Sequence, residues 1–429
     1  MDVLDIGLAD AARLDAADPL GALRDEFRLP MDRDGRREAV YLCGHSLGLQ
    51  PVRAESLVRE ELEDWARLGV EGHLHARRPW VPYHTELTPG LAQLAGAGAG
   101  EVVAMNSLTV NLHLMCVSFY RPTRERYGLL IERPAFPSDR YAAESQVRFH
   151  GYHPADALIE VGPRPGEDSL RSEDLLRAVD EHGDRIALVM LPGVQYLTGQ
   201  LLDMSEVTRL AQRRGCKVGF DLAHAIGNVP LALHDWNVDF AVWCSYKYLN
   251  GGPGAIGGAF VHERHSHAFE LPRFAGWWGH DAASRFEMGP KFMPMPGAEG
   301  WQLSNPPILA MTPLIASLEL FERAGITRLR EKSLALTGRF ERLVRERLAG
   351  RVSVVTPSEP AERGCQLSLR LHLPPGAARS VHESLVAQHL FCDWREPDVI
   401  RAAPVPLYNR FEEVDRFVSA LAVALTNRL

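Results

Sequence analysis

Short apolar runs recur through the middle of the chain, and their length limits the structures that it can form. Each run has five or six residues and is rich in Val, Ile and Phe, which is typical of strands that are buried on both faces. The runs are Tyr127–Glu132, Ile186–Leu191, Lys217–Asp221, Phe240–Ser245 and Gly257–His262. Helical patterns separate some of them, and this alternation predicts an α/β fold with a mostly parallel sheet and helices on both faces. In such a sheet, ligands bind at the carboxyl ends of the strands.

Two of the segments between these strands carry helix signals. Ser172–His182 and Ser205–Arg214 both begin with a serine, which is a favourable N-cap residue. Gly215 follows the second segment, and glycine commonly ends a helix. We therefore expect a helix in each of these connections.

The pattern changes near Pro306. Ile308–Ala324 is typical of one long helix ended by glycine, and a helix to Leu348 and a last helix from Glu412 follow it. The short strands expected between them are Val352–Thr356, Gln366–Leu373 and Val399–Ala402. The chain therefore predicts an N-terminal arm over residues 1–50, a large ligand-binding domain over 51–305, and a connector helix with a small α+β domain over 306–429.

Composition excludes several classes of protein. The chain has 429 residues, of which 46% are hydrophobic and 24% charged, as in ordinary globular proteins. Its formal charge is −8 without a block rich in Lys and Arg, which argues against a nucleic-acid partner. The apolar runs are too short to span a membrane, and the acidic N-terminus lacks a signal-peptide pattern. Six cysteines without a CxxC spacing are typical of reduced thiols, so we expect a cytoplasmic protein.

Asp221 and Lys247 follow two successive predicted strands. Asp221 ends the run KVGFD, so its carboxylate is expected in the ligand crevice, although it could instead cap the segment AHAIGN. Lys247 follows an apolar strand and precedes a glycine-rich loop, and a surface lysine in a turn is the alternative. Burial in an apolar crevice favours the neutral amine of a lysine, which attacks carbonyl groups. A lysine for a Schiff base and an aspartate for the pyridine nitrogen are what pyridoxal 5'-phosphate requires.

A site for the phosphate of this cofactor is expected upstream. The run EVVAMN predicts a strand, and Ser107, Leu108 and Thr109 begin the helix that follows it. A helix N-terminus with hydroxyl side chains binds anions, although Thr109 could also cap the helix. Phe136 follows the strand LLIE and a turn, where it could cover the pyridine ring or pack in the core.

Several motifs, in a fixed order, carry a resemblance to a known family. They are FDLAHAIGNVPLALHDWNVDFAVWCSYKYLN, the later AGWWGH, LSNPPI and VIRAAPVPLYN, and YLCGHSLGLQP near the N-terminus. From Tyr41 almost to the C-terminus, the sequence resembles the kynureninase family of fold type I, aminotransferase-like pyridoxal-phosphate enzymes. The resemblance implies hydrolysis of L-kynurenine or 3-hydroxy-L-kynurenine to anthranilate or 3-hydroxyanthranilate and L-alanine, in tryptophan catabolism or nicotinamide biosynthesis. It also implies a homodimer with the active site at the subunit interface.

The resemblance assigns roles to individual residues. The catalytic residues would be Lys247, which binds the cofactor covalently, Asp221, which pairs with the pyridine nitrogen, and Tyr246, which acts as the general acid. The cofactor-binding residues would be Leu108, Thr109, Phe136, Pro137, Ser138, Asp139, Asp221, His224, Tyr246, Lys247, Trp277 and Asn305, the last two reaching in from the neighbouring subunit. The substrate-binding residues would be Arg401, His73, Ser304 and Asn305. Arg401 would clamp the α-carboxylate, because a guanidinium can pair with a carboxylate through two hydrogen bonds.

Two positions depart from the family pattern. His45 stands where relatives usually have Asn, and Pro192 stands where they often have a hydroxyl residue near the cofactor. Neither position touches the Lys247 and Asp221 pair, but both leave the details of substrate or cofactor contacts open.

Other functions remain as alternatives. A cysteine desulfurase or selenocysteine lyase of the same fold is one, but Cys392 lies in the apolar run HLFC and is better explained as a buried thiol. A catalytically silent binding protein on this fold is another. His262, His265 and His267 lie in VHERHSH, which misses the spacing of the zinc-protease motif, so we expect no metal site.

Overall fold

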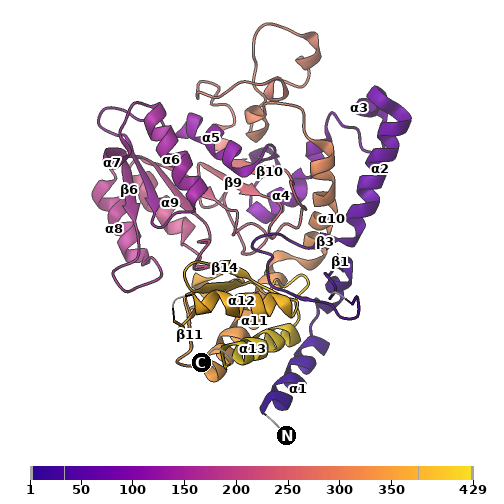
Figure 1. Cartoon of the computed structure of the whole chain (residues 1–429). Coiled ribbons are helices and arrows are strands. Elements are labelled where there is room, and N and C mark those ends of the chain that lie inside the picture. Colours follow the sequence, from indigo (N-terminus) through magenta and orange to yellow (C-terminus); the bar gives the residue numbers. More distant parts are fainter. Residues whose placement is uncertain (1–2, 33, 375, 427–429) are drawn as a thin grey trace.

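The centre of the computed structural model, which describes residues 3–32, 34–374 and 376–426, is a seven-stranded sheet (Figure 1). In spatial order its strands are β4 (Val102–Ala104), β10 (Gly257–Val261), β9 (Phe240–Cys244), β8 (Lys217–Asp221), β7 (Ile186–Pro192), β5 (Gly128–Glu132) and β6 (Leu158–Val161). The pairs from β9 to β6 are parallel, whereas β10 runs antiparallel to both of its neighbours. The predicted α/β class and mostly parallel sheet are therefore confirmed.

Helices cover both faces of this sheet, because successive strand residues point to opposite sides. In β5, Leu129 and Ile131 pack with α5 (Leu108–Phe119) and α6 (Pro137–Phe149), while Leu130 joins the core on the other face. That second core contains residues of α4 (Thr88–Ala95), α8 (Ser172–His182), α9 (Met204–Arg213) and α10 (Ile308–Ala324). A strand buried on both faces needs continuous apolar sequence, which is why these strands were visible as uninterrupted apolar runs.

The predicted helix caps were wrong at both positions. Ser172 is the first residue inside α8, and neither it nor Arg171 makes a side-chain cap. In α9 the cap is Asp203, whose Oδ1 accepts the backbone N–H of Glu206 at 2.9 Å. A serine hydroxyl and a carboxylate can both accept this bond. The carboxylate also carries a negative charge, which interacts favourably with the positive end of the helix dipole.

A second layered unit lies below the large sheet in Figure 1. Its four-stranded antiparallel sheet has the order β11 (Val352–Val354), β12 (Leu367–Leu371), β15 (Val399–Ala402) and β14 (Asp393–Arg395). The helices α11 (Ile326–Arg347), α12 (Ala377–Ala387) and α13 (Phe411–Thr426) share a separate apolar core with this sheet. α10 ends as predicted at Ala324, and Gly325 follows with φ +75°.

The N-terminal segment contacts both units. Helix α1 (Val3–Ala16) lies against α13, and β2 (Val40–Tyr41) pairs in parallel with β13 (Leu390–Phe391). Buried Arg24 ties the segment to the C-terminal unit through an ion pair with Glu413 at 3.0 Å. Further along, β1 (Phe27–Arg28) pairs with β3 (Gln50–Pro51), after which α2 (Val52–Leu68) packs along α10 and leads to α3 (Gly72–His75). Within the described residues, no helix is long and apolar enough to cross a membrane.

Candidate active site

A cavity of about 190 Å³ opens at the carboxyl ends of β5, β7, β8 and β9, the edge at which ligands bind in parallel sheets. The predicted cofactor-binding residues that line it are Leu108, Thr109, Phe136, Ser138, Asp139, Asp221, His224, Tyr246 and Lys247. Pro137 is the first residue of α6, between two residues of this lining. Side chains from four strand ends and two helix N-termini therefore meet in one enclosed space.

Lys247 is the lysine that the fold brings to this cavity. The chain contains four lysines. Lys217 and Lys332 are held in ion pairs with aspartates, and Lys291 lies in a loop that lines a different pocket. Of the four lysines, Lys247 is therefore the one that supplies an amine for covalent chemistry in the cavity.

Close approach of the N-terminal motif fixes the turn that presents this lysine. The N–H of Gly48 donates to the carbonyl of Tyr246 at 2.8 Å, and a Cβ on Gly48 would lie 2.3 Å from the carbonyl oxygen of Lys247. Asn250, with φ +51°, closes the turn by donating its N–H to the same Lys247 carbonyl at 2.9 Å. Only glycine allows the backbone of residue 48 to pack this closely.

His224 is the direct neighbour of the lysine amine. Lys247 Nζ and His224 Nε2 lie 3.1 Å apart. An ammonium group can only donate, so with charged Lys247 the Nε2 atom accepts and the ring proton of neutral His224 lies on Nδ1. Burial holds the pKa of His224 well below its usual value, and the charge on Lys247 lowers it further. His224 Nδ1 has no hydrogen-bond partner among the described residues. The site therefore contains a neutral imidazole with a donor that a ligand can use.

Three buried carboxyl groups share the cavity. Burial raises the pKa of Asp221, but the Lys247 ammonium opposes this effect. Burial raises the pKa of Asp139 well above its usual value and that of Glu132 to about 8, and the neighbouring Asp221 charge raises both further. The Lys247 ammonium therefore favours the negative charge on Asp221, while burial and that charge favour the protonated forms of Asp139 and Glu132. Asp221 Oδ1 also accepts the N–H of Ala223 at 2.7 Å, and this bond stabilises the turn after β8. The segment AHAIGN, which Asp221 was alternatively expected to cap, forms turns rather than a helix.

Two helix N-termini converge opposite these carboxyl groups. α5 and α6 both begin without a side-chain cap, so the first N–H groups of α5 can donate to a ligand. In α6, Pro137 has no N–H and the N–H of Asp139 donates to the carbonyl of Phe136 at 3.0 Å, so Ser138 supplies the N–H for a ligand there. The hydroxyls of Thr109 and Ser138 lie 2.9 Å apart, one from each helix. Thr109 therefore faces the neighbouring helix rather than capping its own, and the pair forms a cradle suited to an anion.

Aromatic side chains form one wall of the cavity. The ring centroids of Phe136 and Tyr246 each lie 5.9 Å from Lys247 Nζ. The ring of Tyr196 meets Phe136 edge to face, with centroids 5.2 Å apart. Burial raises the pKa of the Tyr246 hydroxyl, which therefore keeps its proton at neutral pH.

Arg401 lies in the C-terminal unit, buried behind this wall. Its side chain is 2% exposed, its Nε donates to Asp393 Oδ2 at 2.6 Å, and its Nη1 donates to the carbonyl of Tyr196, which lines the cavity. Arg401 is therefore paired with a nearby acid. The guanidinium is nevertheless enclosed at the junction of the two units rather than on the surface.

The remaining predicted site residues lie elsewhere on the chain. Trp277, Asn305 and His73 line a separate apolar pocket of about 440 Å³, next to residues of α3. Ser304 lines neither pocket, although it precedes Asn305 directly. Within one chain these residues do not meet the cavity that contains Lys247.

Some residues that line the cavity were not predicted from the sequence. Glu132 ends its strand in the same way that Asp221 does, and that position could have identified it. Val194 and Tyr196 follow β7 in an irregular loop, for which the sequence offers no comparable signal. Of the two departures from the family pattern, Pro192 lines the cavity and lies directly opposite Asp221 in the register of β7 and β8, so the expectation that it does not touch the Lys247 and Asp221 pair was wrong. His45 is fully buried near Asp393.

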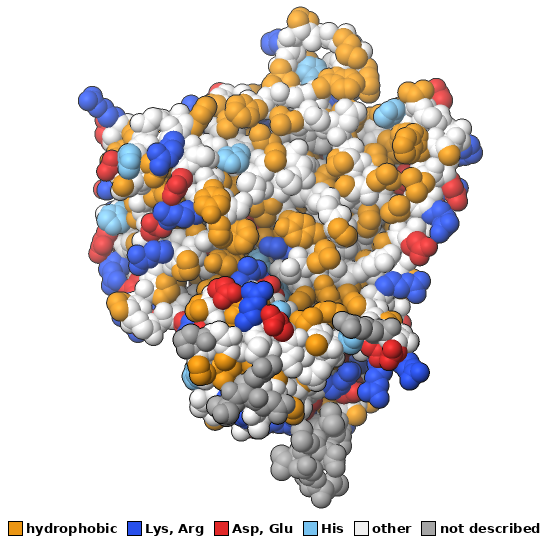
Figure 2. All heavy atoms as spheres, in the orientation of Figure 1, with side chains coloured by type: hydrophobic (Ala, Val, Ile, Leu, Met, Phe, Trp, Pro, Cys, Tyr) orange, Lys and Arg blue, Asp and Glu red, His pale blue; other side chains and the backbone are white. Residues whose placement is uncertain are grey.

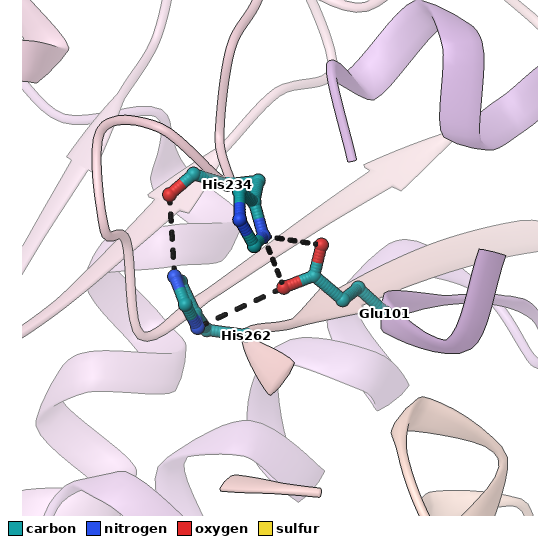
Figure 3. Close-up of side chains that lie close together, drawn as sticks. All are labelled: Glu101, His234 and His262. Carbon is teal, nitrogen blue, oxygen red and sulfur yellow. Dashed lines mark hydrogen bonds and ion pairs between the residues drawn. The ribbon is translucent and has the colours of Figure 1, made fainter. Parts of the chain in front are cut away.

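A second cluster of titratable side chains lies apart from the cavity (Figure 3). Glu101 is buried beside His234 and His262, so a carboxylate does accompany one of the histidines of VHERHSH. His234 Nδ1 donates to Glu101 at 3.0 Å, while His262 Nδ1 accepts the N–H of Arg264 at 3.1 Å. The lone pair that would bind a metal at His262 is thus already used, and the cluster is explained as a hydrogen-bonded link between loops.

The cysteine considered for persulfide chemistry is enclosed. Cys392 is buried, as the apolar run around it predicted. Burial raises the pKa of its thiol well above the usual value, so little reactive thiolate forms at neutral pH. This position does not offer the exposed nucleophile that a desulfurase needs.

Solved structures of other proteins share this architecture. A C-DES mutant with glycine covalently linked to its PLP cofactor matches with a TM-score of 0.76 and 19% identity, over 93% of this chain and 98% of that one. The cysteine desulfurase CsdA from Escherichia coli matches with a TM-score of 0.75 and 16% identity, over 96% and 99%. At these identities the likeness concerns the fold alone.

Sequence comparison gives a closer relationship. Residues 329–421 match the family model of the kynureninase C-terminal domain. The chain is 55% identical over 415 residues to a kynureninase from Koribacter versatilis, covering 97% of each chain. It is 56% identical over 411 residues to a kynureninase from Myxococcus xanthus, covering 96% of each. Identity of this level over nearly the whole length shows that the chain belongs to the kynureninase family.

Proposed function

We propose that this protein is a pyridoxal 5'-phosphate-dependent hydrolase that cleaves L-kynurenine, or its 3-hydroxy derivative, to anthranilate or 3-hydroxyanthranilate and L-alanine. The observation that carries the proposal is the cavity in which Lys247 and Asp221 lie together at neighbouring strand ends. The family relationship over 97% of the chain supports the choice of substrate.

The unsatisfied groups of the cavity fit the cofactor. His224 Nδ1 and Asp139 Oδ1 are buried without partners among the described residues. The open N-termini of α5 and α6, with Thr109 and Ser138, suit the phosphate, and the charge on Asp221 suits a protonated pyridine nitrogen. Phe136 would cover one face of the ring. When bound, the cofactor supplies a sink for the electrons of the substrate α-carbon.

The side chains of the chain then divide the proton transfers. Lys247 would hold the cofactor through Nζ and, with its amine free, would be the base for the α-proton. His224 Nε2 lies 3.1 Å from that amine and would keep it in place. Tyr246 keeps its hydroxyl proton and can give it to the β-carbon when the bond from that carbon to the ketone carbon breaks. The net reaction adds one water molecule across the bond between the β-carbon and the aryl ketone carbon.

A second copy of the chain would complete the site. Hydrophobic side chains gather on the loop at the top of the molecule and at the end of α3 (Figure 2). Val70 is 75% exposed, Leu74 63% and Phe286 56%, around the pocket that contains His73, Trp277 and Asn305. Exposed apolar surface of this extent is typical of an interface. We place the pocket of one subunit against the cavity of its partner, so that it holds the substrate's aromatic ring.

Two measurements test the proposal. The purified protein should show a visible absorption band from its bound cofactor and should convert L-kynurenine to anthranilate, whereas L-cysteine should yield no sulfide. Absence of the band would favour the silent binding protein, and sulfide release without anthranilate would favour the desulfurase.

For the dimer, Leu74→Asp should yield monomers in light scattering and lose activity, while Val423→Asp, at an exposed apolar position on α13, should do neither.

A further inference from the structure

A carboxylate on the neighbouring strand holds Arg401 without any substrate. β14 and β15 are antiparallel, and their register puts Asp393 directly opposite Arg401. Asp393 Oδ2 accepts a hydrogen bond of 2.6 Å from Arg401 Nε and forms an ion pair with Arg401 Nη2. Opposite charges in directly facing positions stabilise an antiparallel pair, so the hairpin sets the position of the guanidinium.

The other end of the guanidinium is held by the unit that contains the cavity. Arg401 Nη1 donates to the carbonyl of Tyr196, and the side chain of Gln366 donates to the same carbonyl at 3.2 Å. Tyr196 itself lines the cavity. The guanidinium thus spans the junction between β14 and the loop after β7, and its plane is fixed from both sides.

The charges around Asp393 leave one positive charge in excess. Asp393 Oδ2 also accepts Arg395 Nε at 3.0 Å, so two guanidinium groups share one carboxylate. The ring of His45 is fully buried with its Nε2 3.8 Å from the same oxygen. Burial and the Arg401 charge lower the pKa of His45 to about 4, so it adds no charge at neutral pH. One carboxylate from a substrate would therefore balance the cluster.

We propose that Asp393 is a positioning residue for substrate binding, which orients Arg401 through Nε and Nη2 and leaves a single positive charge to receive the α-carboxylate of an amino acid. This inference rests on the proposed role of Arg401 in carboxylate binding. Arg395 belongs to the same cluster as a second cation. A carboxylate so placed raises substrate affinity without taking part in proton transfer.

The test compares Asp393→Ala and Asp393→Asn in the holoenzyme. Asp393→Ala should raise KM for L-kynurenine by at least about tenfold, while kcat changes by less than about threefold and the cofactor absorbance stays as in the parent. Asp393→Asn keeps an acceptor for Nε, so its KM should lie between those of the parent and the alanine variant. Asp168→Ala is the matched control, because Asp168 accepts two bonds of 2.8 Å from Arg370 on the same sheet but lies outside the cavity. Its KM should be that of the parent.

Binding of L-alanine separates this inference from the proposed function. Its dissociation constant, read from the absorbance change of the bound cofactor, should weaken in Asp393→Ala even if the parent does not cleave L-kynurenine. A KM and a dissociation constant within about twofold of the parent would overturn the positioning role. So would a lower KM in Asp393→Asn, which would mean that Asp393 competes with the substrate. If the alanine variant does not fold, the asparagine variant decides alone, with a KM raised more than about twofold supporting the role and any smaller change refuting it.

Discussion

The substitution Asp221→Asn separates the two roles that the structure gives to this carboxylate. Asp221 Oδ1 accepts the N–H of Ala223 at 2.7 Å, and the side chain lies in the cavity beside Lys247. Asparagine has the same shape and can keep the bond to Ala223, but it carries no charge. The fold should therefore persist while the counter-charge for the cofactor nitrogen is lost.

The expected magnitudes of the two roles differ clearly. A hydrogen bond such as the one between Ala223 N–H and Asp221 contributes about 1 kcal/mol, so its loss would change kcat/KM by less than roughly tenfold. Two unit charges about 4 Å apart interact by about 4 kcal/mol at an effective dielectric constant of 20, which corresponds to roughly a thousandfold in rate. If Asp221 stabilises charge that develops on the cofactor, Asp221→Asn should lose about three orders of magnitude in kcat/KM.

The assay measures kcat/KM for L-kynurenine, the melting temperature and the cofactor absorbance in the same preparations. Asp203→Asn is the matched control, because Asp203 caps α9 through Glu206 N–H but lies outside the cavity. Its activity should be unchanged. An Asp221→Asn enzyme within about tenfold of the parent would refute the counter-charge role and leave Asp221 with its bond to Ala223 in the turn after β8.

Further predictions concern the cofactor lysine, the substrate clamp, the buried acid, the packed glycine and the histidine cluster. Lys247→Ala should bind the cofactor without the covalent linkage and lose activity; turnover near the parent rate would contradict this. Arg401→Lys keeps the charge but loses the planar fork, so KM for L-kynurenine should rise by about tenfold or more with an unchanged cofactor spectrum; a KM within about twofold would place the carboxylate elsewhere. Burial raises the pKa of Glu132 from 4.5 to about 8 in the folded protein. Between these two pH values, the folded protein therefore binds one more proton at Glu132 than the unfolded chain does. Stability from this group is therefore present at low pH and falls as the pH rises through that window, so Glu132→Gln should raise the melting temperature of the apoprotein more at about pH 8.5 than at about pH 5.5; equal gains would show that Glu132 is ionised at both. Gly48→Ala should destabilise the fold by about 1–3 kcal/mol, because the added Cβ would meet the Lys247 carbonyl oxygen. Gly338→Ala is the control, because a Cβ added there would meet nothing within 4 Å and should not destabilise the fold. If the two variants unfold at the same urea concentration, the contact at Gly48 does not have this effect. Dialysis against a chelator should leave the melting temperature unchanged, because protein hydrogen bonds satisfy the cluster at Glu101; a fall would reveal a bound metal.

Features encoded locally were predictable from the sequence. β5, β7, β8, β9 and β10 are nearly continuous apolar runs because both of their faces are buried, so their predicted positions were right to within a residue or two. The edge strand β6, in which Glu160 is exposed, was not predicted. Asp221 and Lys247 could be identified because a polar residue directly after such a run must lie at the edge of the sheet. The cap at Asp203 was missed because a serine and an aspartate near a helix start are both good caps, and the choice depends on backbone geometry.

Features formed by distant segments were not predictable. Asp393 meets Arg401 only through the register of two strands, and Tyr196 reaches the cavity from an irregular loop. Glu101 lies far from His234 and His262 in sequence, so the spacing of the histidines alone could not indicate their carboxylate neighbour. Trp277 and Asn305 were expected from the family resemblance, and their separation from the Lys247 cavity depends on the folding of a long loop.

The central claim is that Lys247, and no other lysine, carries the cofactor. Borohydride reduction of the holoenzyme fixes a Schiff base as a stable amine, and peptide mass spectrometry then locates the modified lysine. The account predicts one phosphopyridoxyl label for each chain, on Lys247, with none on Lys217, Lys291 or Lys332. A stoichiometric label on any of those three, or no label on a protein that shows the visible absorption band, would contradict it.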